Sequence, residues 1–148
     1  MIFELIISLI CFLGLFVGFF IASKTVEELK PGTKYFVYLQ KALFILTIFF
    51  VLYEYGYLLL GLIAVILFSI FLFWSKKNFD RLMYLVLSLS LFLGFFNQSI
   101  VIPSLIFFYG FPTGTIYYMK SKKVSGLFFE NYYFLIVLIV LLVVREFL

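Results

Sequence analysis

The chain has 148 residues, of which 66% are hydrophobic and only 12% are charged, and its formal net charge is +4. Its mean hydropathy is +1.25. Soluble domains contain roughly 45–50% apolar and 25% charged residues, and a particle of this size leaves much of its surface in contact with solvent. The composition therefore excludes a soluble globular domain and a disordered chain, and it predicts an integral membrane protein.

The inventory of reactive side chains excludes several kinds of chemistry. The sequence contains no His, a single Cys at position 11 and a single Asp at position 80. Zinc sites built from His and Cys need three or four such ligands, and Ser-His-Asp or Cys-His catalysis needs a His. We find no catalytic constellation, and we expect no enzymatic activity, no cofactor and no metal site. Nothing in the sequence resembles a nucleic-acid-binding module, so we expect no nucleic-acid partner.

The first apolar segment spans residues 2–23, and the polar stretch Lys24–Lys34 follows it. A membrane-spanning helix needs about 20 mostly apolar residues, which this segment supplies. Gly14, Gly18 and Ala22 recur every four residues, so they share one helix face and allow another backbone to approach closely. We predict that they form a helix-packing face, either inside the chain or towards a second copy or a partner protein.

The next three apolar segments span residues 35–53, 57–74 and 82–96. Residues 54–56 separate the first two, and the polar loop Ser75–Arg81 precedes the third. The segment 82–96 is short, because fifteen residues rise about 22 Å as a helix against a hydrocarbon core of about 30 Å. Asn97, Gln98 and Ser99 then interrupt the pattern and predict a turn.

The fifth apolar segment, residues 100–119, contains the run Gly110-Phe-Pro-Thr-Gly-Thr115. Proline removes a backbone donor and glycine lowers helix stability, so we expect the helix to be unwound or kinked here. Transporters build substrate and ion sites from broken helices. A candidate substrate or ion site therefore consists of Gly110, Pro112, Thr113, Gly114 and Thr115. The alternative is a kink near the membrane surface, at which the freed backbone groups bond to the threonine hydroxyls and to neighbouring helices.

The last apolar segment spans about residues 127–144. Six spans are favoured over five, in which 82–109 would form one long helix. Loops on the cytoplasmic side carry an excess of Lys and Arg. With six spans and both termini outside, nine loop cations and Lys41 lie inside, which makes ten of the eleven Lys and Arg residues. We therefore predict an all-α, multi-pass helical bundle of the cell (plasma) membrane, a single domain with no soluble part.

The basic loops enforce this topology and attract anionic headgroups. Lys120, Lys122 and Lys123 are the predicted contacts with anionic lipid. The expected partners are the bilayer and, beyond it, a membrane protein partner or a homo-oligomer.

Two functional hypotheses follow from these features. The first is a small transporter or channel-like protein with a broken fifth helix. The second is a non-catalytic subunit or scaffold of a larger membrane protein assembly, which the lack of reactive groups and the aromatic-rich surface favour.

Overall fold

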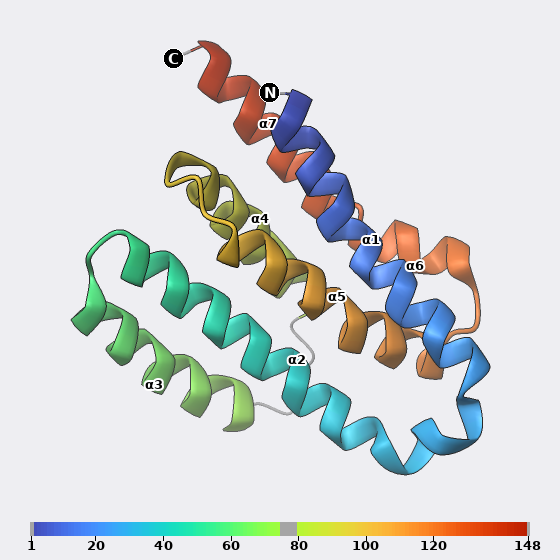
Figure 1. Cartoon of the computed structure of the whole chain (residues 1–148). Helices are drawn as coiled ribbons and strands as arrows, with labels where there is room; N and C mark the ends of the chain where they lie inside the picture. The colour runs from blue at the N-terminus through green and yellow to red at the C-terminus, as the bar shows by residue number, and fades with distance from the viewer. Residues whose placement is uncertain (1, 75–79, 148) are drawn as a thin grey trace.

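A computed structural model describes residues 2–74 and 80–147, with the side chains of residues 26–31 left out. Throughout this part of the chain the structure is all-α, as predicted (Figure 1). The helices are α1 (Ile2–Lys24), α2 (Val26–Glu54), α3 (Leu58–Trp74), α4 (Asp80–Phe96), α5 (Val101–Lys120), α6 (Val124–Asn131) and α7 (Tyr133–Phe147). Between α6 and α7 lies only Tyr132, whose carbonyl accepts a backbone hydrogen bond from Ile136 at 3.1 Å.

Three helical stretches of the described chain are long and apolar enough to cross a membrane. They are Ile2–Lys24, Gly32–Glu54 and Val124–Phe147, the last of which combines α6 and α7. Helix α3 is apolar and shorter, with 17 residues. These helices agree with the membrane protein that the composition predicts.

The helix bounds follow the six predicted apolar segments closely, with one clear difference after the first. The stretch 24–34, expected as a polar loop, is helical from Val26 onwards, and α2 continues through Gly32 to Glu54. The expectation of a loop over this whole stretch is wrong, because only Thr25 separates α1 from α2.

The chain turns sharply between α4 and α5, so a single long helix over 82–109, which the five-span alternative requires, does not form. Ser99 donates its backbone N–H to the carbonyl of Gly94 at 3.0 Å. Gln98 adopts a positive φ of 52°, a conformation that reverses the chain direction and is uncommon for a residue with a side chain. The polar run Asn97-Gln98-Ser99 thus forms the predicted turn.

The closest packing in the bundle joins α1 to α5 through glycine. A Cβ added to Gly14 would lie 2.2 Å from the carbonyl oxygen of Phe107, and one added to Gly18 would lie 2.2 Å from that of Phe111. The paired residue numbers rise together along both helices, so α1 and α5 are parallel. Gly14 and Gly18 therefore pack against α5 within the chain, and Ala22, one turn further along α1, is also buried.

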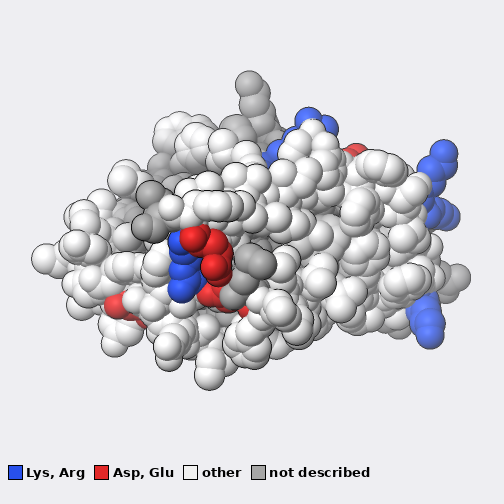
Figure 2. Space-filling view, turned by 90° about the horizontal axis from the view of Figure 1, so that it is seen from above, with Lys and Arg blue, Asp and Glu red and all other residues white. Residues whose placement is uncertain are grey.

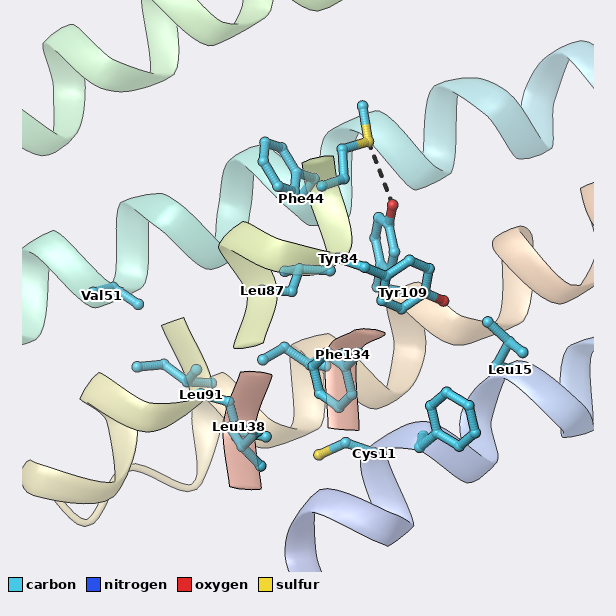
Figure 3. Packing of buried hydrophobic residues seen from close by; sticks show 14 of the residues in the cluster. Cys11, Leu15, Phe44, Val51, Tyr84, Leu87, Leu91, Tyr109, Phe134 and Leu138 are labelled. Atoms are coloured by element: carbon cyan, nitrogen blue, oxygen red, sulfur yellow. Dashed lines mark hydrogen bonds between the residues drawn. The ribbon is translucent and has the colours of Figure 1, made fainter. Parts of the chain in front are cut away.

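The core lies where α4 and α7 close the bundle beside α5 (Figure 3). Leu87 and Leu91 of α4 and Leu138 of α7 are fully buried. The ring of Tyr84 meets those of Tyr109 and Phe134 edge to face, with centroids 5.4 and 5.9 Å apart. Helix α3 lies at the edge of the bundle, packed on α2 (Figure 1).

Polar side chains gather at the two ends of the bundle. We call the end that holds Glu4, Ser99 and Arg145 the terminal end, because both chain termini lie there (Figure 1). The opposite end, which holds Lys24 and Lys120, we call the basic end. The face drawn in Figure 2 is formed mostly by uncharged residues, and its charged side chains appear in a few separate groups.

Candidate functional site: a buried polar network between α2, α4 and α5

The expectation of an unwound fifth helix is wrong. Helix α5 runs from Val101 to Lys120 with Pro112 inside it. Gly110 and Gly114 serve close packing instead. A Cβ on Gly110 would lie 2.4 Å from the backbone nitrogen of Leu15, and one on Gly114 would lie 2.1 Å from its carbonyl oxygen. Proline removes only one donor from the helix, and the contact with α1 along the same turns favours a continuous helix.

The two threonines of the run bond to the carbonyl oxygens of their own helix. Thr113 donates its hydroxyl to the carbonyl of Tyr109 and Thr115 to that of Phe111, both at 2.9 Å. Thr115 also lies 3.3 Å from the carbonyl oxygen of Gly18 on α1. Thr115 is therefore part of the α1–α5 contact. Of the five residues in the predicted substrate site, only Thr113 joins polar side chains from other helices.

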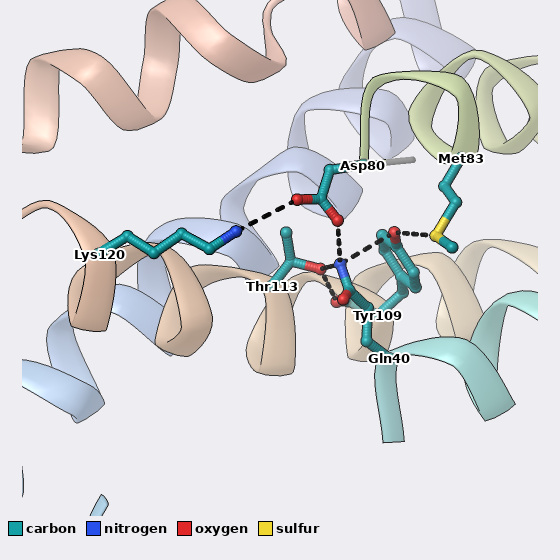
Figure 4. A network of polar contacts seen from close by, with 6 residues as sticks. All are labelled: Gln40, Asp80, Met83, Tyr109, Thr113 and Lys120. Carbon is teal, nitrogen blue, oxygen red and sulfur yellow. Dashed lines mark hydrogen bonds and ion pairs between the residues drawn. The ribbon is translucent and has the colours of Figure 1, made fainter. Parts of the chain in front are cut away.

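That group of side chains centres on Gln40 of α2 (Figure 4). Its Nε2 lies 3.0 Å from Thr113 Oγ1, 3.2 Å from the Tyr109 hydroxyl and 3.4 Å from Asp80 Oδ1. An amide nitrogen carries only two hydrogens, so it cannot donate to all three oxygens at once. The geometry therefore places three acceptor oxygens, from α4 and α5, around a single point beside α2. We call these four residues the Gln40 network.

Three members of the Gln40 network are buried. Gln40 is 4% exposed, Thr113 is 6% exposed and Tyr109 is fully buried. The Tyr109 hydroxyl also donates to the sulfur of Met83 at 3.4 Å. Next to it, the hydroxyl of Tyr84 is buried and has no hydrogen-bond partner among the described residues. The site is thus a cluster of polar side chains in a bundle whose core is mostly apolar.

Asp80 connects the Gln40 network to the basic end. Its second carboxylate oxygen lies 3.6 Å from Nζ of Lys120, and the two side chains are 37% and 52% exposed. A pair this exposed contributes little to stability. Its main effect is to place one negative and one positive charge side by side where the Gln40 network meets the basic end. Lys120, which we predicted as a contact for anionic lipid, pairs with Asp80. Lys122 and Lys123 are exposed beside it.

Lys41, the neighbour of Gln40, contacts the last turn of α3. Its Nζ donates a hydrogen bond to the carbonyl oxygen of Leu72, in the last turn of α3. It also lies 5.4 Å from the centre of the Phe73 ring. The last carbonyls of a helix lack partners within it, and a cation there is favourable. Lys41 therefore caps α3 and holds it against α2.

Sequence reasoning missed Gln40 and did not connect Asp80 to Thr113. A signal for Gln40 was present, because it is the only amide side chain in the predicted span 35–53. The pairing with Asp80 and Tyr109 joins residues 40 and 69 positions apart, and no local pattern encodes such a contact.

The described residues include no group of three or more His, Cys, Asp or Glu side chains that could hold a metal ion. Comparison of the chain with protein-family models, with curated proteins and with solved structures finds no match. Function must therefore be argued from the Gln40 network and its surroundings alone.

Proposed function

We propose that this protein is a small transport protein of the cell membrane, and that the Gln40 network is its substrate site. The observation that carries the proposal is the convergence of three oxygens on the Gln40 amide inside an apolar bundle. Polar side chains are costly within a membrane and commonly mark substrate and ion pathways. We propose no catalytic role for these residues.

The chemistry of the network favours a small monovalent cation as substrate. Asp80 contributes a carboxylate, Tyr109 and Thr113 contribute hydroxyl oxygens, and rotation of the Gln40 amide would present a fourth oxygen. The Lys120 ammonium pairs with Asp80 Oδ2 at the exposed end of the site, so an entering cation would displace this ammonium from the carboxylate. An anionic substrate would have to face the Asp80 carboxylate, which is unfavourable.

We further propose six membrane spans with both termini outside. The parallel packing of α1 and α5 supports this arrangement, since it puts Lys24 and Lys120 at the same end. Two parallel segments are separated by an odd number of crossings, as the first and fifth spans of a six-span chain are. The excess of Lys and Arg at that end then favours the cytoplasmic side for it.

The test is cation flux in liposomes containing the purified protein, measured for Na⁺, K⁺ and H⁺ in separate experiments. We expect flux of at least one cation, and we expect Gln40→Leu and Asp80→Asn to reduce it to the level of protein-free liposomes. Thr47→Val is the matched control. Thr47 is buried on the same helix and bonds only to its own backbone, at Leu43, so this variant should transport normally.

Flux that Gln40→Leu leaves unchanged would remove the Gln40 network from the transport path. Absence of flux for all three cations would contradict cation transport and favour the second candidate, a non-catalytic subunit of a larger membrane assembly. One observation favours that candidate. Helix α3 packs mainly on α2, and its last residue, Trp74, is 84% exposed. Native mass spectrometry after gentle extraction would then show a stoichiometric second protein.

A further inference from the structure

The hydroxyl of Tyr84 on α4 is buried beside the Gln40 network and makes no hydrogen bond there. The side chain is 4% exposed, and its hydroxyl has no hydrogen-bond partner among the described residues. A buried polar group without a partner destabilises the folded state. Such groups are rare in native proteins, and a bound water or ion is one of the reasons for which they occur. Tyr84 therefore points to a bound group at this position.

Helical spacing places Tyr84 in line with the network. Asp80 and Tyr84 are four residues apart on α4, and Tyr109 and Thr113 are four residues apart on α5, so each pair shares one helix face. The two faces meet. The rings of Tyr84 and Tyr109 pack edge to face with centroids 5.4 Å apart (Figure 3), and Asp80 and Thr113 both lie near Nε2 of Gln40. Tyr109, Thr113 and Asp80 also interact electrostatically with the Tyr84 hydroxyl, so Tyr84 and the Gln40 network form one polar cluster.

The oxygens of this cluster outnumber the hydrogens directed at them. Nε2 of Gln40 has hydrogens for only two of the three oxygens around it. The hydroxyl of Tyr109 directs its hydrogen at the sulfur of Met83, and the hydroxyl of Thr113 directs its hydrogen at the backbone carbonyl of Tyr109. Each hydroxyl has only one hydrogen, so neither can also donate to Tyr84. The oxygen lone pairs that remain are suited to a cation and not to an anion.

We propose that the Tyr84 hydroxyl is a further ligand of the cation site, and that the substrate is an alkali metal ion, Na⁺ or K⁺. This inference rests on the proposed transport function and narrows it. Protein oxygens can replace the hydration shell of such an ion, and Tyr84 adds a fifth oxygen to those of Asp80, Tyr109, Thr113 and the rotated Gln40 amide. A proton would bind to the Asp80 carboxylate alone and would leave the Tyr84 hydroxyl without a partner.

The test is the thermal stability of the full-length protein in detergent while NaCl or KCl replaces choline chloride at constant ionic strength. We expect saturable stabilisation by at least one of the two ions, because a ligand that binds only the folded state stabilises it. Tyr84→Phe removes the hydroxyl and keeps the ring. It should weaken the apparent affinity for that ion about tenfold, which corresponds to about 1.4 kcal/mol. In choline chloride alone it should melt at a higher temperature than the unmodified protein, because it removes an unpaired buried group.

Tyr117→Phe is the matched control. Tyr117 is a buried tyrosine of α5, 8% exposed, but its hydroxyl lies against Gly126 of α6, where an added Cβ would be 2.1 Å away. This variant should bind the ion with unaltered affinity. The ion concentration that gives half-maximal flux in liposomes should rise about tenfold in Tyr84→Phe, as the apparent affinity does, and should stay the same in Tyr117→Phe.

The outcomes separate this inference from the proposed function. Stabilisation and flux by Na⁺ or K⁺ that Tyr84→Phe leaves unchanged would overturn the role of Tyr84 and leave cation transport standing. Flux of H⁺ alone would overturn the alkali metal ion and likewise leave cation transport standing. Absence of flux for all three cations would overturn both.

Discussion

Gly110 of α5 packs directly against Gly14 of α1, so that a Cβ on Gly110 would lie 2.6 Å from the carbonyl carbon of Gly14. Lipid chains are as apolar as leucine, and membrane helices therefore associate through close van der Waals contact and not through the hydrophobic effect. The same two helices meet again one turn further, where Gly18 faces Phe111 and Gly114 faces Leu15. This contact sets the position of Thr113 and Tyr109, and with them the Gln40 network.

Adding a methyl group at this contact should loosen the bundle. We expect Gly110→Ala to lower the free energy of unfolding by about 1–3 kcal/mol, the usual cost of overpacking. The measurement is an unfolding titration in mixed micelles followed by circular dichroism. Gly32→Ala is the control, because the added methyl would make only an ordinary contact at 3.7 Å and should stabilise α2 by up to about 1 kcal/mol. Equal effects of the two variants would contradict the role of Gly110.

The hydrogen bond between Gln40 and Thr113 can be measured by a double-mutant cycle. We expect a coupling free energy of about 0.5–1.5 kcal/mol between Gln40→Leu and Thr113→Val, the range found for polar contacts between membrane helices. The same unfolding titration supplies the four values. Thr47→Val combined with Gln40→Leu should be additive, since the Thr47 hydroxyl bonds within its own helix. Additivity in both cycles would mean that the contact does not form.

The cap that Lys41 provides for α3 predicts a local effect. Lys41→Met keeps the length of the side chain and removes its charge, which should cost about 1 kcal/mol. We expect faster hydrogen exchange at the backbone amides of α3, with little change in α5. Lys34→Met on the same helix changes an exposed side chain and should leave the exchange of α3 unaltered. Unchanged exchange in Lys41→Met would contradict the cap.

The proposed topology predicts which residues a membrane-impermeant maleimide reaches. Cys11 is buried, and replacing it by Ser gives a cysteine-free background that keeps a hydroxyl donor towards Pro103. We expect Asn97→Cys to be labelled in intact cells, and Lys34→Cys and Lys122→Cys only after permeabilisation. Labelling of Asn97→Cys and Lys122→Cys from the same side would contradict the six-span arrangement.

The helices themselves could be predicted from the sequence, because long apolar runs and the polar breaks between them are local features. The small-residue spacing of Gly14, Gly18 and Ala22 likewise predicted a close contact, although not its partner. The run from Gly110 to Thr115 was misinterpreted. Its glycines were expected to weaken the helix, whereas they allow α1 to approach, and propensity alone does not separate these two roles.

The sequence by itself determined the helical class and the approximate bounds of the helices. It also placed most of the basic residues at or near the ends of the apolar segments. All three follow from residue composition and order over about 20 positions. Only the tertiary structure decided that α5 lies parallel to α1, that Gln40 meets Thr113, Tyr109 and Asp80, and that Glu4 pairs with Arg145. These contacts join residues that are distant along the chain. They depend on which helices pack side by side, and the sequence of each helix alone expresses only a weak preference for one neighbour over another.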